Sequence, residues 1–209
     1  MTANYHKELE KIISGLTYKP KLLLHACCGP CSSYTLEYLA EHFEITILYY
    51  NPNIYPEEEY FRRLNELKDL LKKFPPALKN KVQFIELKYD PKEFYEAIKI
   101  KENPELADEE EKGERCRRCY EFRLKKALEY AEQNQFEYFC TTLSISPFKD
   151  AEKINTIGRE IETEKTKWLV SDFKKNGGFQ RSLQISKEYN LYRQQYCGCV
   201  YSVRTAVAD

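Results

Sequence analysis

The stretch LLLHACCGPC at residues 22–31 decides the fold of this chain. Its first half is a short apolar run, which is typical of a buried strand, and its second half is a turn rich in cysteine. Residues 32–42 then follow the pattern of a helix, and the apolar residues 45–50 end at the turn NPN, residues 51–53. A strand, a helix and a second strand in this order predict two parallel strands joined by a right-handed crossover.

The same alternation continues to about residue 170. Further strands are predicted at residues 82–87, 136–140 and 168–170. The segments between them have helical patterns, at about 56–73, 91–101, 104–111, 116–134 and 147–164. We therefore expect a single α/β domain over residues 1–209, built on a parallel sheet of about five strands. A helix at about 6–16 precedes the sheet, and a tail of helix and loop at about 172–209 covers one edge together with a cysteine-rich helical insertion.

The composition describes a soluble surface without net charge. The 209 residues include 33 basic and 33 acidic side chains, and the 42% that are apolar suffice for a core. No apolar run approaches the roughly 18–20 residues that a membrane span needs. The N-terminal segment carries Glu and Lys where a signal peptide is apolar, so we expect a cytoplasmic protein. The segment from Asp172 to the end contains six basic and three acidic residues. This excess indicates either a solvated face or a surface for a polyanionic partner.

Seven of the eight cysteines fall into three tight clusters. They are Cys27, Cys28 and Cys31, then Cys116 and Cys119, then Cys197 and Cys199. In a cytoplasmic chain such clusters are more often metal ligands or redox groups than disulfides. One structural zinc or one cubane cluster needs four ligands, so the seven thiols exceed either requirement. A second metal, an exchangeable redox pair or an open coordination site would use the surplus.

Two alternatives to a redox metal site follow from the same residues. The tetrapeptide CGPC at residues 28–31 matches the active site of thioredoxins, in which a helix N-terminus lowers the pKa of the first thiol. The other cysteine clusters have no role in such thiol–disulfide exchange. A zinc-stabilised RNA-binding module is the second alternative, because tyrosines interleave with arginines in the tail and suit stacking on unpaired bases. Core packing explains those tyrosines equally well.

Polar residues follow the predicted strands at their carboxyl ends. Asn51 follows the second strand, Asp90 the third and residues 141–150 the fourth. Open parallel sheets bind ligands at this edge, near the point where the strand order reverses. Because the first cysteine cluster directly follows the first strand, we expect one site at which the cysteines and these polar residues meet. His25 and Cys140 lie within strands and are expected to pack in the core.

Five motifs occur in one order over most of the chain. They are HACCGPC at 25–31, RCRRCY at 115–120 with Arg123, SPFKD at 146–150, DFKK at 172–175 and YCGC at 196–199. Together they resemble the QueH type of epoxyqueuosine reductase. The resemblance implies the last step of queuosine formation in tRNA, in which the epoxide on the modified wobble base is reduced to an alkene without cobalamin. It also implies a fold of the adenine-nucleotide α-hydrolase-like (PP-loop) type, although the phosphate-binding pattern GxxxxGK[ST] does not occur.

The same resemblance implies the cofactors and partners. A [4Fe–4S] cluster and an additional mononuclear iron are expected, with the seven clustered cysteines as ligands. The expected partners are tRNA, which carries epoxyqueuosine in its anticodon stem-loop, and an electron donor. Neither DNA nor a membrane is expected to take part.

Residue roles are hypotheses attached to this reaction. Deoxygenation needs two electrons, protons for the departing oxygen and a Lewis acid that holds that oxygen. Asp150, Asp90 and Tyr120 are the candidate proton donors or positioning residues. The candidate substrate-binding residues are Asn51, Phe148, Lys149, Lys175 and Arg181. The basic side chains among them are expected to hold phosphates of the anticodon loop, and Phe148 is expected to stack on the flipped wobble base.

Overall fold

The structure, a computed structural model, describes the backbone of residues 4–206 and the side chains as far as Val203. Its sheet has five strands, all parallel, in the order β3-β2-β1-β4-β5. The strands are β1 (Lys21–Ala26), β2 (Glu44–Tyr49), β3 (Gln83–Glu86), β4 (Tyr138–Thr141) and β5 (Lys167–Trp168). The predicted parallel α/β sheet is confirmed, and its strand order is consistent with the PP-loop type. Residues 207–209, at the end of the predicted tail, lie outside the described residues.

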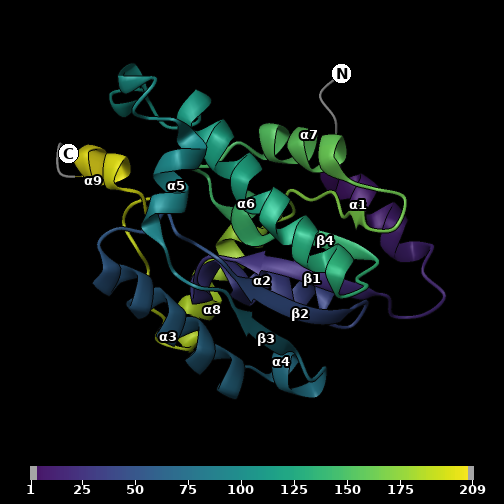
Figure 1. Cartoon of the computed structure of the whole chain (residues 1–209). Helices are drawn as coiled ribbons and strands as arrows, with labels where there is room; N and C mark the ends of the chain where they lie inside the picture. Colours follow the sequence, from purple (N-terminus) through teal and green to yellow (C-terminus); the bar gives the residue numbers. More distant parts are fainter. Residues whose placement is uncertain (1–3, 207–209) are drawn as a thin grey trace.

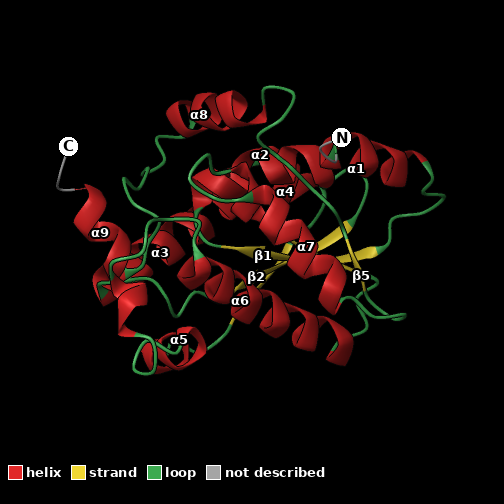
Figure 2. Ribbon diagram, turned by 90° about the horizontal axis from the view of Figure 1, so that it is seen from above, coloured by secondary structure: helices red, strands yellow, loops and turns green. Residues whose placement is uncertain are grey.

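Helices cover both faces of this sheet. They are α1 (Tyr5–Ser14), α2 (Gly29–Leu39), α3 (Glu57–Lys73), α4 (Pro75–Lys79), α5 (Pro91–Ile98), α6 (Glu114–Gln133), α7 (Ala151–Ile161), α8 (Gly178–Glu188) and α9 (Val200–Ala206). The 3-10 turns η1 (Pro104–Ala107) and η2 (Thr142–Ile145) lie in the connections. In Figure 2 the strands lie between α2 and α6, and α8 packs on the outside of α2. Within the described residues no helix is long and apolar enough to cross a membrane.

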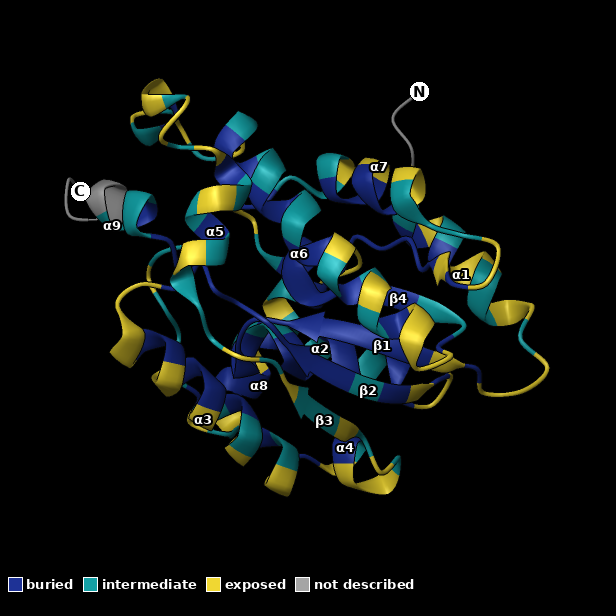
Figure 3. Ribbon diagram, in the orientation of Figure 1, coloured by how far each residue is buried: buried dark blue, intermediate teal, exposed yellow. Residues whose placement is uncertain are grey.

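Strand β1 is buried on both faces, which explains its unbroken apolar sequence. Leu22 and Leu24 belong to the core beneath α2 and α3, whereas Leu23 packs in the core beneath α6 and α7. His25 is fully buried, as predicted, and one of its ring nitrogens bonds the hydroxyl of Thr141 on β4. Figure 3 shows β1 as buried after its exposed first residue, Lys21, while the surrounding helices alternate between buried and exposed positions.

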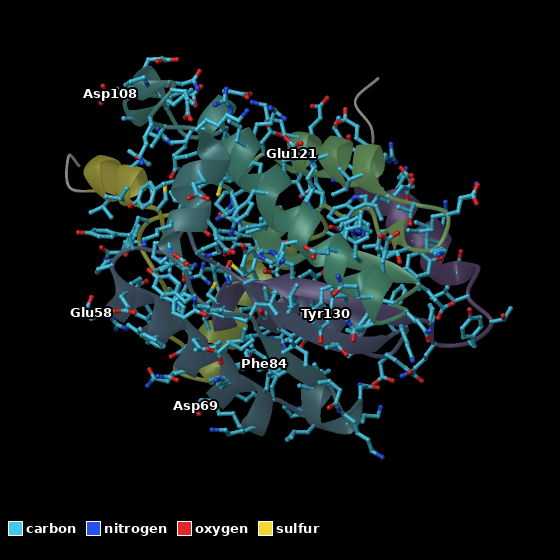
Figure 4. The ribbon with its side chains drawn as sticks, viewed as in Figure 1. Glu58, Asp69, Phe84, Asp108, Glu121 and Tyr130 are labelled. Atoms are coloured by element: carbon cyan, nitrogen blue, oxygen red, sulfur yellow. The ribbon has the colours of Figure 1, made fainter. Side chains whose placement is uncertain are left out.

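The predicted helix at residues 104–111 is wrong. Only the short turn η1 forms there, because the chain folds back so that the Glu109 carboxylate accepts the backbone N–H groups of Glu114 and Arg115, both at 2.7 Å. Those N–H groups have no partner within α6, so Glu109 caps that helix. Figure 4 shows Asp108 at the outer end of this segment, away from the sheet.

Several predicted boundaries also move, and two of the shifts have a clear physical cause. Strand β5 ends at Trp168, because the side-chain amide of Asn155 bonds both backbone polar groups of Ser171 and turns the chain out of the ladder. Helix α2 begins at Gly29, three residues earlier than predicted, because proline is well tolerated in a first turn, where its missing N–H costs nothing. Cys31 therefore lies in the first turn of α2, and Cys28 is the residue that precedes the helix.

The chain leaves β1 and β4 toward opposite faces of the sheet. Helix α2 follows β1 on one face, and α7 follows β4 on the other. The carboxyl ends of these neighbouring strands therefore flank the switch point at which open α/β sheets bind ligands. The segment from α8 to α9 returns to this end of the sheet, where α9 lies near α5 (Figure 1).

Candidate active site

Three cysteine sulfurs converge at the end of β1. The Sγ atoms of Cys27, Cys28 and Cys31 all lie within 4.8 Å of one another. Cys27 and Cys28 are buried, and Cys31 is partly exposed. Among the His, Cys, Asp and Glu side chains that the structure describes, this is the one group of three or more with such close ligand atoms. The spacing fits a single metal ion that keeps a fourth position open.

The other four clustered cysteines surround a second, small cavity. Cys116 and Cys119 lie on α6, and Cys197 and Cys199 come from the hairpin before α9. No three of these four sulfurs lie within 4.8 Å of one another, so the group is wider than the first. Four is the number of thiolates that a cubane iron–sulfur cluster takes as ligands, and such a cluster is larger than a single ion. The number of thiols in each group is therefore compatible with the expected cofactors: the close group of three suits a single iron, and the wider group of four suits a [4Fe–4S] cluster.

Arg63 on α3 holds the hairpin that carries Cys197 and Cys199. Its guanidinium donates to the carbonyl oxygens of Cys197 at 3.2 Å and Tyr196 at 3.4 Å, and it forms an ion pair with Glu59 at 2.7 Å. Only 1% of Arg63 is exposed. Sequence reasoning missed this residue, although its position on the apolar stripe of α3, three residues after the buried Tyr60, is a signal that could have revealed it.

The hairpin also requires its central glycine. Gly198 has a φ of +131°, a conformation that L side chains rarely adopt. A Cβ atom there would lie 2.9 Å from Nη1 of Arg63. The backbone carbonyl of Gly198 accepts the N–H of Tyr55 at 2.8 Å, which fixes the hairpin on the loop before α3. Thus the glycine allows the close approach on which the position of both cysteines depends.

The N-terminal N–H groups of α6 are not free to stabilise thiolates at Cys116 and Cys119, because the Glu109 carboxylate accepts hydrogen bonds from two of them. Burial raises the pKa of Cys116 to about 11 and that of Cys119 to about 12. Both side chains are therefore neutral thiols at neutral pH without metal, and metal binding there releases protons.

The thioredoxin-like alternative is disfavoured by the geometry of the first cluster. In thiol–disulfide exchange the first thiol of the tetrapeptide, Cys28, would be an accessible thiolate. Here Cys28 is 1% exposed, and its hydrogen bond to Cys27 helps to raise its pKa to about 12. Hydrogen bonds from Cys28 and Cys31 instead lower the pKa of Cys27, which is also buried. The arrangement suits metal ligation better than attack on an external disulfide.

A cavity opens beside the first cluster at the switch point of the sheet. Segments after β1 and β4 and the segment before α9 line it, through residues that include Cys31, Phe148, Lys149, Gln194 and Cys197. Phe148 is 62% exposed at this position, whereas Lys149 is 5% exposed. The amide nitrogen of Gln194 donates to Sγ of Cys28 at 3.1 Å. The cavity thus touches both cysteine groups and is the candidate substrate pocket.

Residues 22–205 match the family profile of epoxyqueuosine reductase QueH. The chain belongs to the epoxyqueuosine reductase QueH family. Proteins of that name from Streptococcus pyogenes and Staphylococcus epidermidis are each 40% identical to it, over 97% and 95% of this chain and 78% and 84% of their own lengths. The one from Thermotoga maritima is 34% identical over 87% of this chain and 90% of its own. The resemblance of the five motifs is confirmed, and the chain is an oxidoreductase that reduces epoxyqueuosine to queuosine.

The structure of this epoxyqueuosine reductase brings some predicted site residues to the cysteines. Phe148 and Lys149 line the substrate pocket, and Tyr120 lines the cavity of the four-cysteine group. Asn51 is 1% exposed and donates to the carbonyl oxygen of Ala26 at 2.8 Å, next to Cys27. It therefore fixes the end of β1 directly before the first cysteine.

Other predicted site residues of the reductase are engaged elsewhere. Asp90 and Asp150 cap α5 and α7 by accepting the backbone N–H groups of Lys92 and Lys153, both at 3.1 Å. Arg181 forms ion pairs with Glu37 at 2.7 Å and Glu188 at 3.1 Å, and Lys175 is exposed on the turn before α8. The tail tyrosines also make internal contacts. The guanidinium carbon of Arg62 lies 3.3 Å from the centre of the Tyr192 ring, and that of Arg63 lies 5.2 Å from the centre of the Tyr196 ring.

Proposed function

We propose that the reductase acts on epoxyqueuosine at the wobble position of tRNA and uses two iron sites. The four-cysteine group of Cys116, Cys119, Cys197 and Cys199 would hold a [4Fe–4S] cluster. The three-cysteine group of Cys27, Cys28 and Cys31 would hold a further iron. The observation that carries the proposal is the division of the thiols into a wide group of four around a small cavity and a close group of three, with one cysteine of each group lining the substrate pocket.

The chemistry requires both sites to meet the substrate. Reduction of an epoxide to an alkene takes up two electrons and two protons, breaks both C–O bonds and releases water. When bound, an iron–sulfur cluster would supply electrons, and an iron with an open position would supply a Lewis acid. The pocket supports this assignment because it is lined by Cys31 from one group and Cys197 from the other.

Buried cations offset the negative charge that seven metal-bound thiolates bring into the protein. Arg123 is 2% exposed, lines the four-cysteine cavity and bonds the carbonyl oxygen of Cys119. Neighbouring thiolates, with Cys119 and Cys197 foremost, outweigh the opposing effect of burial and raise the pKa of Arg123. One of its terminal nitrogens has no hydrogen-bond partner among the described residues, so it has a donor free for a sulfur in the cavity.

The outer part of the pocket supports an unpaired base as the substrate. An exposed aromatic ring beside a cavity suits stacking on a flipped base, and Phe148 provides that ring. Arg193 lines the same cavity and keeps its guanidinium over the Phe179 ring, 5.7 Å from the ring centre.

Of the three predicted proton donors, Tyr120 is the one that lines a cysteine cavity, whereas Asp90 and Asp150 already serve as helix caps.

The test is anaerobic purification followed by analysis of iron and labile sulfide and an EPR spectrum after reduction with dithionite. We expect iron in excess over sulfide and a reducible cluster. Zinc alone, with no labile sulfide, would support the RNA-binding module and overturn the two-site proposal.

Single cysteine variants separate the two groups. Cys116→Ser should lose labile sulfide and the EPR signal of the cluster, because it removes one of four ligands. Cys31→Ser should lower the iron content and leave the sulfide content unchanged. Cys140→Ser is the matched control, since Cys140 is buried in β4 and bonds the carbonyl oxygen of Leu169 at 3.2 Å. Loss of sulfide in Cys31→Ser would show that the division between the two groups is wrong.

A further inference from the structure

Lys149 occupies an unusual position for a lysine that was expected to bind phosphate. It is 5% exposed, and it lines the pocket together with Cys31 and Cys197, one cysteine from each group. Phosphates of an RNA backbone remain at the surface when a base is flipped into a protein pocket. Lys149 therefore lines the pocket assigned to the modified base, and its low exposure does not suit contact with a phosphate at the surface.

No hydrogen bond or ion pair within the described part of the chain holds this ammonium group, although the charges of the nearby Cys197, Cys27 and Cys31 thiolates favour its protonated form. Its Nζ atom makes no hydrogen bond or ion pair with any residue that the structure describes, whereas Nζ of the nearby Lys174 binds Asp172 at 3.0 Å and the carbonyl oxygen of Ser144 at 2.8 Å. The adjacent carboxylate of Asp150 accepts the backbone N–H of Lys153 as the cap of α7. The thiolates balance the charge without occupying the N–H donors of Lys149, so these donors remain available to a group that enters the pocket.

We propose that the ammonium group of Lys149 binds the epoxide oxygen of the substrate and stabilises the negative charge that develops on it. This inference rests on the proposed function. In the balanced reaction a low-potential electron carrier delivers two electrons, both C–O bonds of the epoxide break, a C=C bond forms, and the oxygen leaves as water with two protons. A donor aimed at an oxygen that gains negative charge lowers the barrier to this C–O cleavage.

Arg123 provides the internal comparison for a role that only balances charge. Both cations are buried near the cysteines, but Arg123 lines the four-cysteine cavity, whereas Lys149 lines the substrate pocket. A residue that only offsets thiolate charge acts on metal retention. A residue that faces the substrate acts on the chemical step after metal and RNA are bound.

The test compares Lys149→Met and Lys149→Arg in the anaerobically purified, iron-loaded enzyme. Three quantities are measured: iron and sulfide content, the Kd for epoxyqueuosine-containing tRNA, and the single-turnover rate at saturating tRNA with excess dithionite. We expect Lys149→Met to keep its metals and its Kd within about threefold while the rate falls by roughly 100-fold to 1,000-fold. Lys149→Arg keeps the positive charge and should recover part of that rate.

Three outcomes would overturn the assignment. An unchanged single-turnover rate in Lys149→Met excludes a role in the chemical step. Loss of iron or sulfide assigns Lys149 to charge balance like Arg123, and a weaker Kd with an unchanged saturated rate assigns it to RNA binding. Lys149→Gln provides the same readouts should the methionine variant misfold. Failure of the proposed function is distinguishable, because the wild-type enzyme itself would then lack iron or fail to reduce the epoxide.

Discussion

Arg63 donates a hydrogen bond to the carbonyl oxygen of Cys197 over 3.2 Å, and this contact ties the last cysteine hairpin to α3. Replacement by methionine would leave the Glu59 carboxylate, which is 8% exposed, without its ion-pair partner. We expect Arg63→Met to lower the free energy of unfolding by about 3–5 kcal/mol. Urea denaturation under anaerobic conditions measures this loss.

The matched variant for Arg63→Met is the double substitution Arg63→Met with Glu59→Gln. It removes the buried carboxylate that the single substitution leaves without an ion-pair partner. It should recover at least half of the lost free energy of unfolding. If the single variant loses less than about 1 kcal/mol of unfolding free energy, the Arg63–Glu59 pair contributes no more than an exposed ion pair. That result would contradict the role of Arg63 as the anchor of the hairpin.

Phe148 is expected to contribute to RNA binding and not to folding. Because 62% of Phe148 is exposed, Phe148→Ala should change the free energy of unfolding by less than about 0.5 kcal/mol. Loss of a stacked base costs about 1–3 kcal/mol, so KM for the tRNA should rise roughly tenfold. Steady-state kinetics test this, with Tyr18→Ala as control, since Tyr18 is 63% exposed and precedes β1 at the opposite end of the sheet. Equal effects of the two substitutions would argue against stacking at Phe148.

Asp150 offers a distinction between a helix cap and a proton donor. Asn caps helices as well as Asp does, so Asp150→Asn should retain both the free energy of unfolding and the rate of epoxide reduction. Asp150→Ala removes the cap of α7 and should cost about 1 kcal/mol in thermal or chemical unfolding. A rate reduced 100-fold or more in a fully stable Asp150→Asn would instead assign proton transfer to this carboxyl.

Cys140 gives a pH-dependent prediction away from both cysteine groups. Burial raises the pKa of its thiol from 9.0 to about 12. The folded protein therefore holds this proton at pH values where the unfolded chain has released it. The resulting contribution to stability is complete below pH 9.0 and is lost as the pH rises from there toward about 12.

Alkylation with iodoacetamide at pH 8.5, read by mass spectrometry, tests the state of Cys140. The residue should remain unmodified in the folded enzyme and react fully in urea, because the reactive species is the thiolate. Rapid labelling of Cys140 without denaturant would show that β4 opens locally and would contradict its complete burial.

Local patterns determined the architecture of this protein. The run of residues 22–26 is apolar without interruption because β1 is buried on both faces, and this property is visible in one dimension. The alternation of strand and helix then predicted a parallel sheet, and the position of the first cysteines after β1 predicted a site at its carboxyl edge. The ends of helices were harder to predict from the sequence. The cap of α6, for example, comes from Glu109, which was expected to lie within a helix of its own.

The sequence by itself established seven clustered cysteines and their family, whereas only the tertiary structure decided how they divide. Membership of the group of three or the group of four depends on which sulfurs face the same cavity, and this is set by contacts between segments far apart in the chain. The burial of Lys149 and the anchoring by Arg63 were decided in the same way. A charged residue on an apolar stripe, such as Arg63 on α3, gives at most a signal of burial, and the partner that it binds is defined only when the distant segments are in place.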